Sequence, residues 1–313
     1  MTLKILRPGT YSILTGPLRL GSMHQGVPRG GPADRHSWII GNALVGNESG
    51  TESDACIALE ITLTGPLLQA MQPVTLVLAG SAFDMKLESN RGSRLLQPGH
   101  VFEMHEGDIL DIAECKQGMR AYLCTPGGFQ STELNGGIVR APLKPADMLL
   151  THSIARNRFH NRWIEPEVWP DQSPLGTLRM LSGTHCEKKW LQQLLQATFT
   201  VSKDSSRMGI RLTTNLKRQQ KSDTMLSSPV VPGTLQWPNG GAPILLGVDA
   251  QSIGGYPRYG HVVSADMDAL GQLKAGEAIR FQLVNLQEAE QLRQSRNRWQ
   301  QLWVNRLLSM RYP

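Results

Sequence analysis

The alternation of apolar and polar side chains in the first half of the chain predicts short strands. Residues 56–64 (CIALEITLT) alternate regularly, which is typical of a strand with one buried and one solvated face. Glu60 and Thr62 fall on the face expected to meet solvent. The opposite face would carry Ile57, Leu59, Ile61 and Leu63.

Further strands are predicted by short apolar runs that end at turn residues. Residues 74–79 (VTLVLA) form one run, which Gly80 would terminate. Residues 120–124 (RAYLC) form another, directly before the turn Pro-Gly-Gly at 126–128. A strand at residues 177–181 (TLRML) opens a second series, so strands dominate both halves of the chain.

Helical spacing of apolar residues occurs in three places. It begins after Asp34, a residue suited to cap a helix over residues 35–45, and recurs over residues 187–197. A third helix is predicted from Leu286 onward, and we expect its apolar stripe to pack on the second domain, with a partner-binding helix as the alternative. That stripe consists of Leu292, Trp299, Trp303 and Leu307.

The irregular, proline-containing stretch at residues 151–176 predicts a linker whose Trp163 and Trp169 pack against a domain. The expected division is therefore a first domain over residues 1–150 and a second domain, with the C-terminal helix, over residues 177–313.

Composition supports a folded, strand-rich protein. The 313 residues are 40% hydrophobic and 19% charged, which suffices for a sizeable core, and 31 glycines with 19 prolines favour many turns. No window of about 18 apolar residues suggests a membrane span, and the start MTLKILRPG lacks the apolar core of a secretion signal. We therefore expect a cytoplasmic protein without membrane contact, in which Cys56, Cys115, Cys124 and Cys186 are free thiols.

The formal net charge of +6 raises the question of nucleic-acid binding. The basic residues are scattered, apart from short arginine-rich patches, and they are not interleaved with aromatic residues as in RNA-binding sheets. A solvated basic surface is the simpler interpretation, and we expect no nucleic-acid partner. The sequence also contains no phosphate-binding loop and no spacing of His and Cys suited to a metal.

The last third of the chain carries polar residues where strands should end, which is typical of the rim of a site. Arg207 could bind a carboxylate through two hydrogen bonds, or form a salt bridge that holds its own loop. Asp249 could act as a base or orient a donor, or cap the following turn. We predict a catalytic role for both and for Gln236.

Amide and glycine residues nearby suit a small polar ligand. Gln236 and Gln251 offer donors and acceptors that match urea, lactam or ureido groups, although loop hydrogen bonds would also explain them. Gly254 and Gly255, before Tyr256, permit close approach of a ligand to the backbone, or simply form a tight turn. We predict that Gln251, Gly254, Gly255 and Tyr256 bind substrate.

These pieces together resemble the family variously called biotin-dependent carboxyltransferase, allophanate hydrolase subunit 2 or the KipA-type C subunit of 5-oxoprolinase. The resemblance rests on segments that occur in the family's order over nearly the whole chain. They are residues 26–34, 41–47, 59–66, 121–129, 178–183, 205–212, 226–246, 249–257 and 270–281.

The resemblance implies a mainly β fold of two tandem cyclophilin-like β-barrels, with a few short helices, a C-terminal helix and a cleft that takes substrate-binding residues from both barrels. Arg19 and Asp34 are the candidates from the first half, although Asp34 also suits a helix cap. The chain departs from the family's pattern at TGPLR (15–19), where only Arg19 is kept, at Ser206, which stands where the family has Asp, and at the shortened segment 129–137.

The resemblance leaves three functions open. The first is a subunit of an ATP-dependent amide or lactam hydrolase, acting with a KipI-like B subunit and a LamB/YcsF-like A subunit, inactive alone and sharing any ATP site with a partner. The second is a carboxyltransferase that moves a carboxyl group from carboxybiotin to urea or a similar amide. The third is a non-catalytic antagonist of a KipI-type kinase inhibitor. No resident metal is expected in any of them.

Overall fold

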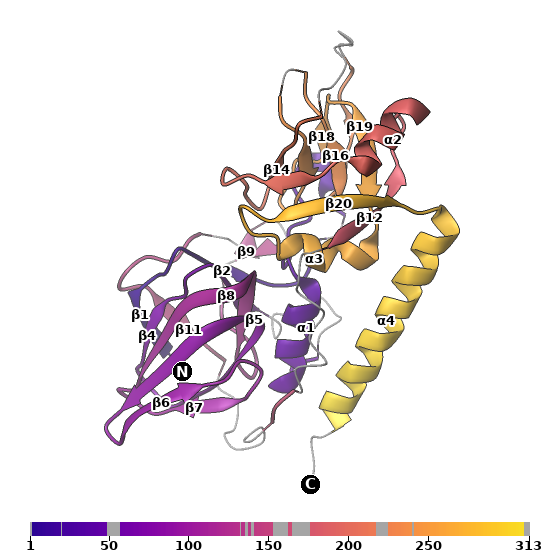
Figure 1. Cartoon of the computed structure of the whole chain (residues 1–313). Coiled ribbons are helices and arrows are strands. Elements are labelled where there is room, and N and C mark those ends of the chain that lie inside the picture. The colour runs from indigo at the N-terminus through magenta and orange to yellow at the C-terminus, as the bar shows by residue number, and fades with distance from the viewer. Residues whose placement is uncertain are drawn as a thin grey trace. The chain divides into compact units, whose positions relative to one another are not determined.

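The computed structural model describes residues 2–19, 21–48, 57–131, 133–134, 137–138, 141–152, 162–164, 176–216, 225–239 and 241–309. The chain divides into two compact units, and each draws on separate parts of the sequence (Figure 1). The first unit comprises Met1–Leu18, Asp34–Gln172 and Trp299–Pro313, and the second comprises Arg19–Ala33 and Ser173–Arg298. No helix in the described ranges has an apolar stretch long enough to cross a membrane.

The first unit is built on a nine-stranded antiparallel sheet that forms a half-barrel. Its strand order is β11-β1-β4-β8-β3-β2, and β5 pairs with β6, β7 and β8. The strands are β1 (Thr2–Arg7), β2 (Tyr11–Thr15), β3 (Ala58–Thr62), β4 (Leu67–Ala70), β5 (Val74–Ser89), β6 (Gly92–Leu96), β7 (Phe102–Met104), β8 (Ile109–Cys124) and β11 (Met148–Leu150). A separate two-stranded ribbon joins β9 (Glu133–Leu134) to β10 (Gly137–Ile138).

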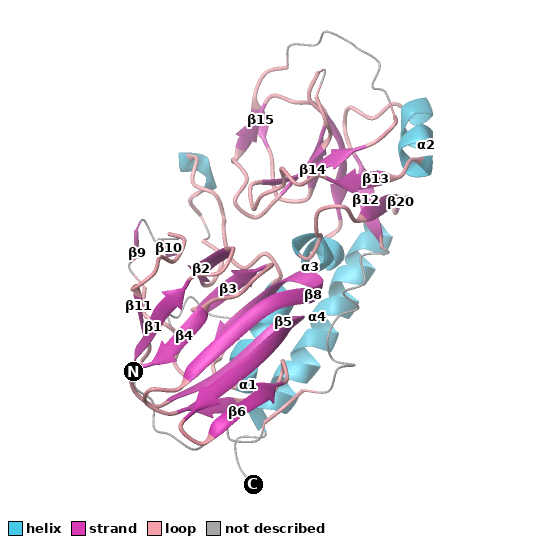
Figure 2. Ribbon diagram, turned by 60° about the vertical axis from the view of Figure 1, so that its left-hand side comes forward, coloured by secondary structure: helices cyan, strands magenta, loops and turns pink. Residues whose placement is uncertain are grey.

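The two longest strands, β5 and β8, run side by side and dominate the sheet (Figure 2). Both are longer than the sequence pattern predicts, and β5 continues through Gly80 instead of ending there. Gly80 has φ +121°, and the β5–β8 register shifts between Gly80 and Ala82. A Cβ at Gly80 would lie 2.8 Å from the Arg120 carbonyl oxygen. The glycine therefore marks an irregularity within a strand, not its terminus.

Strand β3 differs from the prediction in its burial. All five of its residues are buried, including Glu60 (0% exposed) and Thr62 (5%). The polar face of this strand therefore meets protein, because Glu60 accepts a hydrogen bond from the buried Tyr122 hydroxyl at 2.9 Å. Alternation in the sequence located the strand but did not identify what covers its polar side.

Helix α1 (Arg35–Leu44) begins where the sequence predicts, and Asp34 is its N-cap. The Asp34 carboxylate accepts hydrogen bonds from the Ser37 backbone N–H (2.9 Å) and from the Ser37 hydroxyl (2.5 Å). These bonds satisfy a donor that a free helix end would leave unpaired.

Helix α4 (Leu286–Ser309) does not pack on the second unit as a whole, contrary to our expectation for its apolar stripe. Val304 and Leu307 belong to the core cluster of α1, and Trp303 packs against it. Trp299 stacks on His36 of α1, with ring centroids 5.0 Å apart. These contacts lie within the first unit, whose boundary falls inside α4 after Arg298. The preceding part of α4 belongs to the second unit, within which Arg296 pairs with Asp268 at 3.0 Å.

The second unit is a closed barrel of seven strands in the order β12-β19-β16-β17-β14-β13-β20. These strands are β12 (Thr177–Ser182), β13 (Phe199–Val201), β14 (Gly209–Thr213), β16 (Thr234–Gln236), β17 (Ile244–Leu246), β19 (Arg258–Val262) and β20 (Ala278–Leu283). A two-stranded ribbon of β15 (Ser228–Pro229) and β18 (Ile253–Gly254) accompanies the barrel. The remaining elements are α2 (Lys188–Gln196), α3 (Met267–Gly271) and the 3-10 turns η1 (Met23–Gln25) and η4 (Ser264–Asp266).

An aromatic cluster fills the core of the second unit. Trp237 lies in edge-to-face contact with Trp190 of α2, with centroids 5.1 Å apart, and Phe199 lies in edge-to-face contact with Phe281 at 5.1 Å. Such pairs fix ring orientation as well as burying apolar area. The predicted mainly β fold, with a few helices including one near the C-terminus, is confirmed: the second unit is a closed barrel and the first a half-barrel.

Most of the predicted linker lies outside the described residues, and Trp169 is among those not described. Trp163 is described: it is 50% exposed, and its ring stacks on His100 of the first unit with centroids 5.7 Å apart.

The packing of α4 on α1 predicts a difference between two leucines of the same helix. Leu307 is 2% exposed, so Leu307→Ala should lower the free energy of unfolding by about 2–4 kcal/mol. Leu302 is 65% exposed, so Leu302→Ala should change it by about 0.5 kcal/mol or less. Urea denaturation of both variants measures the difference. Equal effects would show that the end of α4 does not contribute to the core.

Candidate functional site

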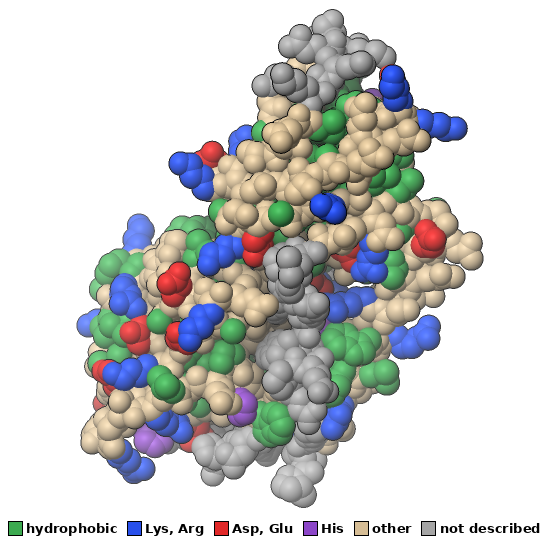
Figure 3. Space-filling view, viewed as in Figure 1, with side chains coloured by type: hydrophobic (Ala, Val, Ile, Leu, Met, Phe, Trp, Pro, Cys, Tyr) green, Lys and Arg blue, Asp and Glu red, His purple; other side chains and the backbone are tan. Residues whose placement is uncertain are grey.

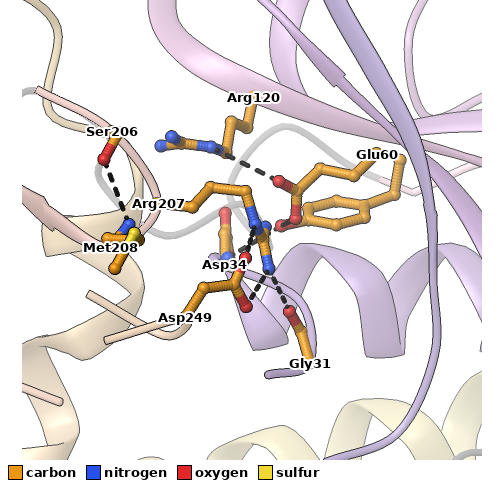
Figure 4. A network of polar contacts seen from close by, with 9 residues as sticks. Gly31, Asp34, Glu60, Arg120, Ser206, Arg207, Met208 and Asp249 are labelled. Carbon is orange, nitrogen blue, oxygen red and sulfur yellow. Dashed lines mark hydrogen bonds and ion pairs between the residues drawn. The ribbon is translucent and has the colours of Figure 1, made fainter. Parts of the chain in front are cut away.

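Three segments that are distant in the sequence meet at the Arg207 side chain in the second unit (Figure 4). Its Nε donates to Asp249 Oδ2 at 2.7 Å and its Nη2 to Asp249 Oδ1 at 3.2 Å. Nη2 also donates to the Gly31 carbonyl oxygen at 2.7 Å. The loop before β14, the loop after β17 and segment 19–33 are therefore joined by one guanidinium group.

Backbone contacts position the two charged residues. Asp249 N–H donates to the Arg207 carbonyl at 3.1 Å, and Gly247 N–H donates to the Met208 carbonyl at 3.0 Å. A Cβ at residue 247 would lie 2.2 Å from the Arg207 carbonyl oxygen, so only glycine permits this approach. Segment 19–33 is held in the same way, because Gly30 N–H donates to the Val248 carbonyl at 3.1 Å.

Ser206 supports the turn that presents Arg207. Its hydroxyl oxygen accepts a hydrogen bond from the Met208 N–H at 3.3 Å, and its backbone exchanges two hydrogen bonds with Gly209. A short oxygen-bearing side chain suffices for this task, which Ser and Asp both perform in turns. The Ser206 departure from the family's pattern therefore preserves the turn.

The Arg207–Asp249 pair is buried more deeply than a polar surface loop would suggest. The Arg207 side chain is 6% exposed and the Asp249 side chain 25% exposed. The bidentate geometry is that of the salt bridge named as the alternative for Arg207, and a catalytic role for either residue stays a prediction. Chemically, the pair offers a partly exposed carboxylate held in a fixed orientation by a cation.

Gln236 is enclosed at the end of β16. It is 1% exposed, and its Nε2 atom has no hydrogen-bond partner among the described residues. A Cβ at Gly254 would lie 2.8 Å from this nitrogen, so the glycine allows β18 to approach the amide. Gly255 backs onto the Met225 carbonyl, which a Cβ would approach to 3.3 Å. Both glycines thus meet protein groups in the chain as described.

The other predicted residues of the second unit lie apart from these contacts. Gln251 is exposed and Tyr256 is 47% exposed, so both face solvent. Arg19 belongs to segment 19–33, where its backbone N–H donates to the Arg29 carbonyl at 2.8 Å. Substrate contact by these residues stays a prediction.

Asp34 belongs to the first unit and takes part in a second polar group. Its backbone N–H donates to the Tyr122 hydroxyl oxygen at 2.8 Å, and that hydroxyl donates in turn to Glu60. Arg120 Nε lies 3.5 Å from Glu60 Oε1 (Figure 4). Burial, together with the carboxylates of Glu60 and Asp34, holds the pKa of the Tyr122 hydroxyl well above its usual value. The hydroxyl therefore stays protonated and donates.

Sequence reasoning missed this group, because Glu60, Arg120 and Tyr122 lie within strands that were interpreted only by their apolar pattern. A signal was available: Glu60 and Arg120 are charged residues inside otherwise buried runs, and buried charges need partners. The observed contacts of Asp34, as a helix cap and a partner of Tyr122, are structural.

Three further observations on the described residues concern a cavity, metal binding and surface charge. A cavity of about 460 Å³ in the first unit is lined by Leu14, Gln130, Leu143, Asp147 and neighbouring residues, and none of the predicted site residues lines it. No three His, Cys, Asp or Glu side chains in the described ranges gather at metal-binding distance. On the face shown in Figure 3, lysine and arginine side chains are scattered among acidic and uncharged ones.

Residues 25–283 match the family described as carboxyltransferase domain, subdomain A and B, and the chain belongs to that family. The match extends over both units and includes Gly31, Arg207 and Asp249.

Among individual relatives, the chain is similar to the C subunit of 5-oxoprolinase from Escherichia coli strain K12, with 29% identity covering 95% of this chain and 96% of the relative. It is 30% identical to the C subunit of 5-oxoprolinase from Haemophilus influenzae, covering 88% of this chain and 89% of that protein. It is also 27% identical to a putative urea carboxylase of Emericella nidulans, where the match covers 91% of this chain but 24% of that protein.

Solved structures agree on the fold. A crystal structure of TTHA0988 superposes with a TM-score of 0.79 and 27% identity, over 90% of this chain and 55% of that chain. The urea amidolyase of K. lactis superposes with a TM-score of 0.82 and 24% identity, over 96% of this chain and 20% of that one. At this identity the match supports a shared fold alone.

Burial of the Arg207–Asp249 pair predicts strong energetic coupling. Asp249→Leu removes a carboxylate that is paired with the buried Arg207 guanidinium, and should lower the free energy of unfolding by about 1–3 kcal/mol. The loss is smaller than for a fully buried pair because the Asp249 side chain is 25% exposed. The double variant Arg207→Met/Asp249→Leu should recover part of that loss. A double-mutant cycle by urea denaturation measures the coupling.

The exposed pair Arg7–Asp111 provides the matched control. It has a similar N–O distance of 2.6 Å, but its side chains are 51% and 38% exposed. Its coupling should be about 0–1 kcal/mol. If the Arg207–Asp249 cycle gives no more than this control, the pair does not join the three segments.

Among the described residues, Cys115, Cys124 and Cys186 form no disulfide, whereas Cys56 lies outside the described residues. Burial, with a smaller effect of the Glu187 carboxylate, raises the pKa of the partly buried Cys186 thiol to about 11. We predict slow alkylation of Cys186 by iodoacetamide at neutral pH and a rate that rises with pH up to about 11, because only the thiolate reacts. Peptide mass spectrometry separates the cysteines, with free glutathione as the reference thiol. A plateau near pH 9 would contradict the prediction.

Proposed function

We propose that this chain is a subunit of an ATP-dependent amide or lactam hydrolase complex, acting as the C subunit of a 5-oxoprolinase. The observation that carries the proposal is reciprocal coverage: the match spans 95% of this chain and 96% of the Escherichia coli relative, itself the C subunit of 5-oxoprolinase. The matches to the putative urea carboxylase and the urea amidolyases instead span at most a quarter of those proteins.

Lactam hydrolysis breaks the ring C–N bond: the carbonyl carbon gains a hydroxyl from water and the ring nitrogen gains a proton. The reaction needs donors toward the carbonyl oxygen, on which negative charge develops, and a group that orients or deprotonates water. In this proposal the partly exposed Asp249 carboxylate, held by Arg207, performs the second task. Gln236 supplies an amide N–H to a substrate oxygen, consistent with its unpartnered Nε2 among the described residues.

Partner subunits complete the proposed enzyme. The sequence contains no phosphate-binding loop, so ATP would be bound by or shared with a KipI-like B subunit, and a LamB/YcsF-like A subunit would be the third component. Gln251 and Tyr256, which face solvent in this chain, are placed by the proposal where substrate or a partner can reach them.

Carboxyl transfer is the second candidate, and the family description favours it specifically. In that reaction a carboxyl group leaves the ureido nitrogen of carboxybiotin and is taken up by a nitrogen of urea or a similar amide. The same fixed donors would hold the amide acceptor, and biotin would arrive on a separate carrier protein. A non-catalytic role, as antagonist of a KipI-type kinase inhibitor, would need the partner-binding surface alone.

The proposal predicts that the isolated chain hydrolyses neither ATP nor 5-oxoproline, whereas the chain co-purified with its B and A partners does both. Coupled ADP release and glutamate formation measure the two activities. Asp249→Asn should lower the glutamate formation of the complex by at least about tenfold, while Asp111→Asn, in the exposed pair of the first unit, should leave it unchanged.

Three results would contradict this assignment in different ways. Robust turnover by the chain alone would refute the shared site. Transfer from carboxybiotin to urea without lactam cleavage would favour the second function. Tight binding of a kinase inhibitor, with no ATP or lactam turnover by any assembled complex, would favour the regulatory one.

A further inference from the structure

Two pairs of strands in the second unit bring a small group of polar side chains onto one face. In the β15–β18 ribbon, Ser228 lies directly opposite Gly254. In the barrel, Gln236 of β16 lies opposite Arg258 of β19. Directly opposed residues of a regular antiparallel pair project to the same side, so Ser228 and Gly254 share a face. Gln236 and Arg258 are neighbours next to a register shift between β16 and β19.

Close contacts join the two pairs. A Cβ on Gly254 would lie 2.8 Å from Gln236 Nε2, so the open side of this glycine faces the Gln236 amide. Ser228, opposite Gly254, projects to that same side. On the neighbouring strand, Arg258 Nη1 donates to the Pro229 carbonyl at 3.2 Å, which ties β19 to the ribbon. Ser228, Gln236 and Arg258 therefore surround one small region.

All three side chains bring a buried polar atom that has no hydrogen-bond partner among the described residues. These atoms are Ser228 Oγ, Gln236 Nε2 and Arg258 Nε. Gln236 is 1% exposed, so its amide cannot turn to water. Buried polar atoms are satisfied in the great majority of cases, and each exception requires an explanation. Three such atoms in one place can all be satisfied by a single bound group.

The chemistry of the three atoms defines that group. Gln236 Nε2 and Arg258 Nε can only donate, and the Ser228 hydroxyl can donate as well. Arg258 also carries a permanent positive charge. A planar group with two acceptor oxygens and a negative charge satisfies all three, and this is a carboxylate.

We propose that Ser228, Gln236 and Arg258 bind the carboxylate of the small-molecule substrate. The proposal rests on the proposed function in taking a lactam acid as that substrate, and it gives Gln236 the task of anchoring the substrate. Gly254 is required because its missing side chain leaves room beside the Gln236 amide.

The test compares two ligands with the same lactam ring. 5-Oxoproline carries a carboxylate and 2-pyrrolidinone does not. Titrations followed by ligand-observed NMR, on the isolated chain and on its co-purified complex without ATP, should show at least about tenfold tighter binding of 5-oxoproline. Gln236→Met and Ser228→Ala should each reduce this preference several-fold. Gln282→Met, an exposed glutamine on β20 of the same barrel, should leave it unchanged.

Thermal unfolding of the ligand-free variants distinguishes binding from a structural role. Removing a buried polar atom that has no partner removes a cost, so Ser228→Ala and Gln236→Met should keep or raise the melting temperature. Gly254→Ala should weaken 5-oxoproline binding, because its Cβ would displace the Gln236 amide. A lower melting temperature for Ser228→Ala would mean that the hydroxyl is already satisfied within the protein, which overturns the proposal.

Equal binding of the two ligands, by the chain and by the complex, would also overturn it. The outcome is separable from that of the proposed function. A carboxylate preference in a complex without lactam turnover supports this site and not the hydrolase. Lactam turnover without a carboxylate preference supports the hydrolase and not this site.

Discussion

The second unit depends on the requirement that a buried guanidinium be neutralised. Arg207 reaches across from the turn before β14 and uses its N–H groups on Asp249 and Gly31. A buried cation without such partners would carry a large desolvation penalty. The loop after β17 and segment 19–33 are therefore held where the Asp249 carboxylate and the Gly31 carbonyl can accept hydrogen bonds from Arg207. Gly247 completes the constraint, since a side chain there would collide with the Arg207 carbonyl.

Strands and helices could be predicted where local pattern decides them. Asp34 predicts the start of α1, because capping is a local interaction between a side chain and the next three residues. Gly80 misled the prediction, since glycine occurs both at strand ends and at irregularities inside strands. The choice depends on β8, a partner some forty residues away, which no local pattern contains.

The candidate site could be predicted as a list of residues but not as an arrangement. Arg207 and Asp249 were singled out by their positions at strand ends, and they do meet. Their burial, and the participation of Gly31, follow from the tertiary fold. Ser228 and Arg258 were not singled out. Ser228 precedes Pro229 and Arg258 follows Pro257, and such pairs are ordinary in loops. Their significance lies in the absence of partners among the described residues, which only coordinates reveal.

The discontinuous first unit has a consequence for biosynthesis. Its core cluster around α1 includes Val304 and Leu307, which a ribosome adds about 270 residues after Trp38. Domains usually fold in the order of their synthesis. Here the unit that starts first cannot complete its core until the second barrel has been made. Throughout that interval an apolar surface of α1 stays uncovered, so the nascent chain should depend on chaperones more than two sequentially folding barrels would.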